Sequence, residues 1–268
     1  PSRILDMCHL GPLLSDAPPS PPIKGFLVFN ANPANSCPDM NRVHRGLMRE
    51  DLFTVVHEQV MTDTAKLADV IWPATTFLEQ DDLFKSYGQY TLQFGKGCLP
   101  PRGEARCNHD VVNALAQAMG FSEPAFSGSS LERIEQVLAA SNYPPLTEWR
   151  KPGWLDCRPP RSERQFEERF PTQDGRFHFY PHWGHTTMPS MPDHWPVNAR
   201  DREKQGGIDT LDFMVPPSVE TLNTTLSHLP TATRLWQPPR LWIHPEDARV
   251  RAIEEGDEVV VANERGRL

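Results

Sequence analysis

The sequence predicts an α/β fold built on a parallel, doubly wound (Rossmann-like) sheet. Three short apolar runs, each typical of a buried strand, occur at residues 26–29, 52–56 and 70–72. A polar turn and a helical pattern separate the first two runs, and a polar loop with a helix-start signal separates the last two. Strands that alternate with helices favour parallel pairing, because a crossover connection returns the chain in the same direction.

The first predicted strand lies within residues 23–30 and ends in an Asn–Pro turn. The turn carries Asn30, Asn32 and Pro33 in close succession. Asparagine and proline in this order favour a turn that exposes amide groups and backbone N–H groups. We therefore expect polar donors beyond the carboxyl end of this strand.

Residues 52–79 hold the next two strands and the loop between them. The apolar run ends in a polar loop from His57 to Thr62, and Pro73 stops the third strand because it cannot continue a central ladder. Thr62, Asp63 and Thr64 offer side-chain oxygens that can accept the first free N–H groups of a helix. In such sheets, ligands bind beyond the carboxyl ends of the strands.

Helices are predicted at residues 40–49, 110–119 and 131–140. Gly120 follows the second helix as its C′ residue. In the first and third helices, the apolar side chains expected to face inward are Met40, Val43, Leu47, Met48, Leu131, Ile134, Val137 and Leu138.

Shorter strands and irregular connections are expected in the rest of the chain, which contains 28 prolines. Residues 87–93 and 172–180 are typical of hairpins, the second around the turn Asp174–Gly175. Residues 211–216 and 259–261 are predicted as strands, the latter turning back at its end. Residues 142–160 are broken by prolines.

Composition narrows the classes of function. The net charge of −8 argues against a nucleic-acid partner, and no apolar run approaches the roughly 20 residues that span a membrane. The five cysteines are scattered and form no Cys-x-x-Cys pair, which excludes an ordinary zinc or iron–sulfur framework within these residues. His182 and His185 could bind a metal, but interrupting residues leave no helix to fix the pair, so no metal ligand is predicted.

Three motifs in a fixed order resemble the molybdopterin oxidoreductase family of the dimethyl sulfoxide reductase type. The first is His57-Glu58 followed by Thr-x-Thr-Ala-x-x-Ala-Asp-Val-Ile-x-Pro-Ala-Thr, which begins at Thr62, and by Glu79. The second is Leu-Asn-Thr-Thr at residues 222–225. The third is Pro-Glu-Asp-Ala at residues 245–248, followed by Gly-Asp and Asn-x-x-Gly.

The resemblance implies three segments and one large cofactor. Residues 1–22 are expected to be a linker or the end of a preceding domain. Residues 23–207 would form the dinucleotide-binding domain, with an irregular insert at 142–207, and residues 208–268 the first part of a double-psi β-barrel. The cofactor would be bis(molybdopterin guanine dinucleotide) with molybdenum, or with tungsten in its place.

The resemblance also implies which residues contact that cofactor. Amides and hydroxyls suit a pterin or guanine, whose edges alternate donors and acceptors. In place of the arginine that many members carry beside the glycine at position 88, this sequence has Gln89. The expected contacts are Asn30, Asn32, Pro33, His57, Thr62, Thr64, Asp69, Gln89, Gln93, Asn223, Thr224 and Thr225.

Other parts of such an enzyme are expected upstream of Pro1. They are the molybdenum ligand, which is a serine, cysteine or selenocysteine in this family, and in many members a [4Fe–4S] cluster. The chain by itself is expected to be an inactive piece of a molybdenum oxidoreductase.

Expected partners are a small-molecule substrate and an electron-transfer subunit or iron–sulfur protein, with no nucleic acid and no membrane span. The location would be cytoplasmic, or periplasmic if a twin-arginine signal precedes.

Two other classes of protein stay open as alternatives. A nicotinamide or flavin dehydrogenase lacks support, because no G-x-G-x-x-G follows the strand at residues 26–29. A noncatalytic α/β scaffold that kept the fold and lost the cofactor is compatible with every motif above. Metal content distinguishes that scaffold from the enzyme.

Overall fold

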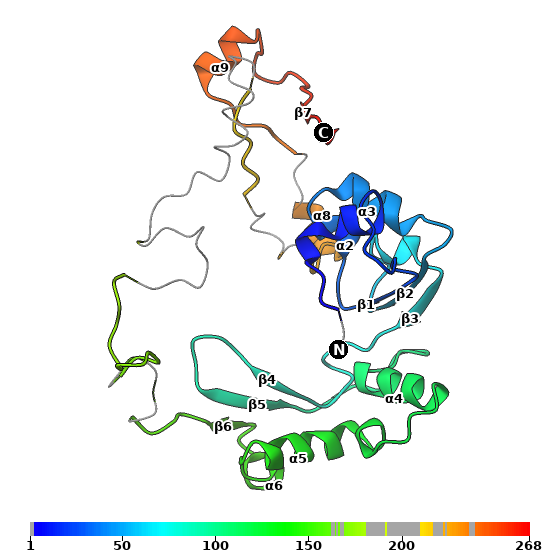
Figure 1. Cartoon of the computed structure of the whole chain (residues 1–268), viewed down its shortest axis with the longest axis vertical. Helices are drawn as coiled ribbons and strands as arrows, with labels where there is room; N and C mark the ends of the chain where they lie inside the picture. Colours follow the sequence, from blue (N-terminus) through cyan, green and yellow to red (C-terminus); the bar gives the residue numbers. More distant parts are fainter. Residues whose placement is uncertain are drawn as a thin grey trace. The chain divides into compact units, whose positions relative to one another are not determined.

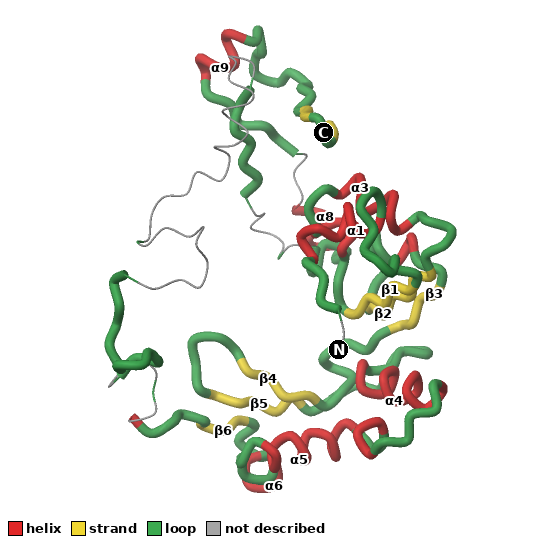
Figure 2. The backbone as a smooth tube through the Cα atoms, in the orientation of Figure 1, coloured by secondary structure: helices red, strands yellow, loops and turns green. Residues whose placement is uncertain are grey.

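The computed structural model describes residues 3–161, 164, 166, 169–180, 191, 210–216, 222, 224–235 and 239–268. Figures 1 and 2 trace the chain with its helices and strands. The chain divides into two compact units. The first comprises Pro1–Phe84, Phe94–Gly153 and Pro217–Leu268, and the second comprises Lys85–Gln93 and Trp154–Pro216.

A three-stranded parallel sheet in the first unit confirms the predicted pairing. Its order is β1 (Gly25–Phe29), β2 (Phe53–Glu58) and β3 (Val70–Pro73). In the register of both pairs, Val28 lies beside Val56 and Val56 lies beside Ile71. Residues 54–57 of the central strand are buried, as expected for a strand with neighbours on both sides.

Helices α1 (Leu10–Leu14), α2 (Pro33–Ser36) and α3 (Met40–Leu47) lie together on one side of this sheet (Figure 1). The core between them consists of buried Leu14, Ala34, Val43, Leu47 and Leu52. Phe26 of β1 packs against this core and also against the cluster of Val28, Val56 and Ala65, where Ala65 opens the 3-10 helix η2 (Ala65–Leu67). The sheet is thereby fixed to its helical layer.

The stretch predicted as a linker, residues 1–22, contains η1 (Met7–His9) and the packed helix α1. Leu14 is fully buried, and its side chain packs so closely on Gly46 of α3 that a Cβ at Gly46 would collide with it. Sequence analysis missed this contact for two reasons. The segment is rich in proline, and the close approach depends on a glycine that lies far along the sequence.

Two further expectations in this unit are corrected. The sequence predicts His57 in a polar loop, but it belongs to β2, where it pairs with Phe29 on one side and Trp72 on the other. The parallel ladders therefore continue past the end of the apolar run. Met40 and Met48 are expected to face inward on the first predicted helix, but they are exposed, while Val43 and Leu47 of that helix are buried.

A second sheet has the strand order β4 (Asp82–Lys85), β5 (Thr91–Gly95) and β6 (Trp154–Asp156). β5 and β6 are antiparallel. The prolines around residues 142–160 hid β6 from sequence analysis. The predicted helices are confirmed as α4 (Asn108–Ala118) and α5 (Ser130–Ala140), and between β5 and β6 the chain also forms η3 (Pro124–Phe126) and α6 (Leu146–Trp149).

The C-terminal segment contains α8 (Pro230–Leu235), α9 (Pro245–Val250) and a hairpin of β7 (Ala262–Asn263) with β8 (Gly266–Arg267). Pro245, the first residue of the Pro-Glu-Asp-Ala motif, begins α9, and the predicted terminal turn is confirmed. In contrast, no strand forms at residues 177–180, 211–216 or 259–260. An apolar run becomes a strand only when another strand pairs with it, and among the described residues these runs have no such neighbour.

Within the part of the chain that the structure describes, no helix is both long enough and apolar enough to cross a membrane.

Candidate functional site

Three loops meet at the carboxyl edge of the parallel sheet. They follow β1 at residues 30–36, β2 at residues 59–64 and β3 at residues 74–81. Backbone hydrogen bonds tie their first residues together: the Asn30 N–H donates to the His57 carbonyl at 3.3 Å, and the Ala74 N–H donates to the Glu58 carbonyl at 3.0 Å. This is the edge at which the sequence predicted a ligand.

Asn32 and Thr64 join the first two loops through a buried hydrogen-bond network. The Asn32 Oδ1 accepts from the Thr64 backbone N–H at 3.1 Å and from the Thr64 hydroxyl at 2.8 Å. The Thr64 Oγ1 in turn accepts from the Ala34 N–H at 3.0 Å. Both side chains are buried, so these predicted contacts hold the loops in place from within.

Three other predicted residues belong to the same loops, and they range from exposed to buried. Asn30 is exposed and has a φ of +47°, a left-handed conformation that asparagine tolerates well. The Thr62 Oγ1 accepts from the Ala65 N–H at 3.1 Å, which confirms the predicted helix-start signal. Pro33 is buried as the first residue of α2, directly beside Asn32. The structure thus brings Asn30, Asn32, Pro33, Thr62 and Thr64 to one edge.

Asp63 carries a fixed negative charge between Asn35 and Lys66. Its carboxylate accepts from the Asn35 amide at 3.1 Å and from the Lys66 ammonium at 3.0 Å. These two hydrogen bonds, the one from Asn35 contributing most, lower the pKa of Asp63, and they outweigh the opposing effect of partial burial. The rim therefore stays charged into acidic solution.

The end of β2 and the second and third loops add polar groups that sequence analysis missed. The Gln59 amide donates to the Thr75 carbonyl at 3.0 Å, and the Thr75 hydroxyl donates to Gln80 Oε1 at 2.7 Å. Glu58, at the end of the central strand, is half-buried, and its Oε1 accepts from the Gln59 N–H at 2.8 Å. Thr75 and Glu58 belong to the motif on which the family resemblance rests. That motif was the signal from which sequence analysis could have identified these two residues.

His57 cannot contact a ligand directly in this arrangement, because its side chain is fully buried. The ring packs edge-on to Phe29 at 5.4 Å between centroids, and Nδ1 lies 3.1 Å from the Trp72 carbonyl, to which it can donate as N–H. Nε2 is then the acceptor nitrogen, and it has no partner among the described residues. His57 therefore fixes the spacing of the three strands beneath the loops.

Asp69 lies at the opposite end of the sheet from these loops. Its Oδ2 accepts from the Thr54 N–H at 2.6 Å, and its own N–H donates to the Thr54 carbonyl at 2.9 Å. Thr54 stands near the start of β2, so this carboxylate joins the beginnings of β2 and β3. The structure does not bring Asp69 together with Asn32 and Thr64.

Unpartnered donors remain at the carboxyl edge after this internal bonding. The backbone N–H groups of Ala31, Met61 and Asp63 have no hydrogen-bond partner among the described residues. Ala31 and Met61 are exposed and Asp63 is half-buried. Such N–H groups suit phosphate oxygens, and a carboxylate such as that of Glu58 suits the N–H donors on a guanine edge.

The remaining predicted residues lie elsewhere in the chain. Gln89 and Gln93 belong to the second unit, on or beside β5. Thr225 forms an isolated bridge with Leu222, and Thr224 is half-buried beside it. Asn223, His182 and His185 lie outside the described residues. Among the residues that are described, no group of three His, Cys, Asp or Glu side chains could hold a metal ion.

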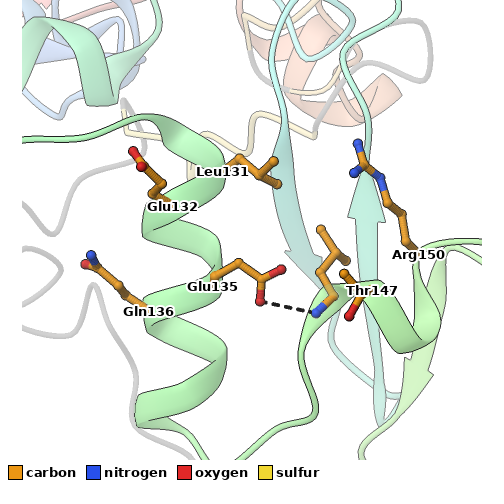
Figure 3. Close-up of a pocket in the computed structure, with 7 residues that line it drawn as sticks. Leu131, Glu132, Glu135, Gln136, Thr147 and Arg150 are labelled. Carbon is orange, nitrogen blue, oxygen red and sulfur yellow. Dashed lines mark hydrogen bonds between the residues drawn. The ribbon is translucent and has the colours of Figure 1, made fainter.

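A separate depression between α5 and α6 has a volume of about 370 Å³ (Figure 3). Glu135 points toward α6 and accepts from the Leu146 N–H at 3.3 Å. None of the residues predicted to bind the cofactor lines this depression. The main polar contact of this depression joins α5 to α6, so we assign the depression to the packing of these two helices.

Comparisons with known proteins match two segments of the chain to family models. A family model described as "Molybdopterin oxidoreductase" matches residues 13–118, and one described as "Molydopterin dinucleotide binding domain" matches residues 211–268. The chain is 31% identical over 270 residues to "Probable oxidoreductase YoaE" of Bacillus subtilis, covering 98% of this chain and 38% of that protein.

Two further similarities extend this result. The chain is 27% identical over 263 residues to the F420-dependent formate dehydrogenase subunit alpha of Methanocaldococcus jannaschii, covering 92% of this chain and 36% of that one. The solved structure of acetylene hydratase from Pelobacter acetylenicus shares the fold, with a TM-score of 0.76, 21% identity, and coverage of 97% of this chain and 36% of that chain. The chain thus spans little more than a third of the length of these proteins.

Proposed function

Because this chain belongs to the molybdopterin oxidoreductase family, we propose that it binds molybdopterin guanine dinucleotide as part of a molybdenum or tungsten oxidoreductase. When bound, the cofactor supplies two-electron redox chemistry at its metal, and the protein supplies binding, orientation and electrostatics. The observation that carries the proposal is the carboxyl edge of the parallel sheet, where three loops converge and present polar groups.

The residues at this edge fit the chemistry of the dinucleotide. The free N–H groups of Ala31, Met61 and Asp63 would bind phosphate oxygens, and the exposed Asn30 amide would add a donor. The half-buried Glu58 carboxylate would accept from the guanine edge, which presents two donors side by side. Lys66 lies close enough to Asp63 to offset its charge beside a phosphate.

The buried residues would act by positioning. Asn32 and Thr64 hold the first two loops at a fixed separation, because one carbonyl oxygen accepts both donors of the threonine. His57 and Asp69 set the strands from which these loops start. We therefore assign these four residues to the support of the site, and Asn30 and Thr62 to its surface.

The finer fold belongs to the same proposal. Residues 23–207 would complete a doubly wound dinucleotide-binding domain, and residues 208–268 would be the first part of a double-psi barrel. The match of residues 211–268 to a dinucleotide-binding family model supports the second assignment. Thr224, Thr225 and Asn223 would reach the cofactor from that segment.

The whole protein would act on a small substrate such as an oxyanion, an S- or N-oxide, a sulfur compound or formate. Relatives named as nitrate reductase, trimethylamine-N-oxide reductase and formate dehydrogenase subunit support this range. An electron-transfer subunit or iron–sulfur protein would exchange electrons with it. The alternative is a noncatalytic scaffold that has the fold without the cofactor.

Metal and nucleotide analysis of the purified protein separates these two functions. The proposal predicts molybdenum or tungsten at about one atom per chain, together with guanine nucleotide released on hydrolysis. A protein with neither metal nor guanine nucleotide, produced in cells that make the cofactor, would instead be the scaffold.

A further inference from the structure

The short helix α2, which lies in the loop after β1, is held from two directions by side chains of other elements. Toward its start, the Ala34 N–H donates to the Thr64 hydroxyl oxygen at 3.0 Å. Toward its end, the Ala34 carbonyl oxygen lies 2.8 Å from Nε2 of His44, which belongs to α3. One residue of α2 is therefore bound both by the loop after β2 and by a neighbouring helix.

The hydrogen bond between His44 and α2 has one possible direction. A carbonyl oxygen can only accept, so Nε2 carries the hydrogen and donates it to Ala34. Among the described residues, this carbonyl is the one hydrogen-bond partner of the imidazole ring. The side chain is half-buried, which limits the competition from water for the same carbonyl. The bond therefore joins α3 to α2 through a single nitrogen atom.

The position of α2 depends on such bonds because the helix is very short. It has four residues, Pro33–Ser36, whereas a helix that is stable by itself needs roughly 12 to 15. Its neighbour α3 is firmly placed, because Val43 and Leu47 are buried in the core. The core also buries Ala34, but packing of a methyl group does not fix the rotation of a helix about its axis, and directional hydrogen bonds do.

The orientation of α2 determines the shape of the rim of the candidate site. The unpartnered N–H of Ala31 lies just before this helix, and within it Asn35 donates to Asp63 at 3.1 Å. The imidazole of His44 also lies near that carboxylate. The hydrogen bonds from Asn35 and Lys66 lower the pKa of Asp63 most, and the charge of protonated His44 adds to their effect. A rotation of α2 would therefore move groups of the rim.

We infer that His44 is a positioning residue of the dinucleotide site: it holds α2 by the Ala34 carbonyl and so keeps the loop after β1 at a fixed separation from the loop after β2. The inference rests on the proposed function, and it adds α3 to the elements that build this site. His44 acts through Ala34, and the groups that would touch the dinucleotide are those of the two loops.

The test compares three variants of the purified protein. His44→Gln places an amide N–H donor where Nε2 stands, whereas His44→Asn places its amide one bond closer to the backbone and out of reach of Ala34. The control is His109→Asn, which applies the shorter substitution to a bond of the same kind. Nε2 of His109 lies 2.9 Å from the Gly128 carbonyl, and neither residue belongs to the loops of the site.

Hydrogen exchange of the backbone amides at residues 34–37 is the first readout, and it does not require the cofactor. His44→Asn leaves the Ala34 carbonyl without its donor, so exchange there is expected to become roughly 2- to 12-fold faster. His44→Gln is expected to restore the wild-type rate. His109→Asn is expected to leave the rate at residues 34–37 unchanged.

The molybdenum or tungsten and the guanine nucleotide retained per chain are the second readout. His44→Asn is expected to retain less of both, whereas His44→Gln and His109→Asn are expected to retain as much as the wild type. Both substitutions at His44 remove the aromatic ring. Restoration by glutamine therefore separates the donor at the Nε2 position from a general loss of packing.

The inference is overturned if His44→Asn leaves exchange at residues 34–37 at the wild-type rate, or if His44→Gln exchanges there as fast as His44→Asn. Its failure is distinct from failure of the proposed function. A wild-type protein that contains metal and guanine nucleotide, with variants that all retain both equally, would refute the role of His44 alone. A wild-type protein with neither would refute the proposed function, and the exchange rates would still decide whether His44 holds α2.

Discussion

Replacing Thr64 by valine tests whether the buried network holds the loops of the site. Valine has nearly the same shape as threonine, so the change removes the hydroxyl and little packing. The Ala34 N–H would lose its acceptor in a buried position, which costs about 1–3 kcal/mol. Asn32 would lose one of its two donors, which costs about 0.5–1.5 kcal/mol. The expected loss in free energy of unfolding is therefore about 1.5–4.5 kcal/mol.

Urea unfolding followed by tryptophan fluorescence measures this loss, and hydrogen exchange at the Ala34 N–H measures it locally. A loss of about 2 kcal/mol corresponds to roughly 30-fold faster exchange.

Two matched variants separate the effect of the hydroxyl from the effect of side-chain shape. Thr64→Ser keeps the hydroxyl and loses one buried methyl group, so about 0.5–1.5 kcal/mol is expected.

Thr54→Val is the second matched variant. Thr54 is also fully buried on β2, but its Oγ1 has no partner among the described residues. Removing that hydroxyl is expected to leave the free energy of unfolding unchanged or to raise it by about 1 kcal/mol. Equal small effects of Thr64→Val and Thr54→Val would refute the reasoning, because the two hydroxyls would then be energetically alike.

Three further predictions concern the rest of the sheet and its rim. Asp69→Ala would leave the Thr54 N–H without its acceptor and lower the free energy of unfolding by about 1–3 kcal/mol in the urea titration, whereas Asp69→Asn keeps an acceptor and should cost less. Because the pKa of Asp63 is lowered in the folded chain, its contribution is complete above the unfolded value of about 4 and is lost as pH falls through the folded value. The protection of residues 61–66 against hydrogen exchange, taken relative to the unfolded chain at the same pH, should therefore fall below about pH 4 in the wild type. Asp63→Asn should remove most of that pH dependence, and an unchanged profile would contradict this. His57→Phe keeps the edge-on contact with Phe29 and removes the Nδ1 hydrogen bond to the Trp72 carbonyl, so it should lower the free energy of unfolding by about 1 kcal/mol in the urea titration; an unchanged value would contradict the positioning role of His57.

The parallel sheet and its loops followed from local patterns because strand, turn and helix signals there agree. The apolar run at residues 26–29 forms part of β1, and the turn residue Asn30 follows it, as predicted. The prediction that His57 lies in a polar loop was wrong for a different reason. A polar residue ends an apolar run in the sequence, but two flanking strands and the ring of Phe29 bury it in the structure.

Contacts between distant residues could not be read from the sequence. β6 pairs with β5 across about 60 residues, and its prolines on either side suggested an irregular segment. Leu14 packs on Gly46 through a close approach that no local pattern records. The candidate site shows the same limit, since the sequence grouped Asp69 with Thr64, although they lie at opposite ends of the sheet.

The most direct measurement is the ratio of guanine nucleotide to molybdenum or tungsten in the purified protein and in a variant of its loop rim. The account predicts about two GMP released per metal atom from the wild type. Glu58→Ala, at the end of the central strand, is expected to lower both in proportion while leaving unfolding by urea nearly unchanged. A wild-type protein that binds the metal without any guanine nucleotide would contradict the claim that these loops bind the dinucleotide.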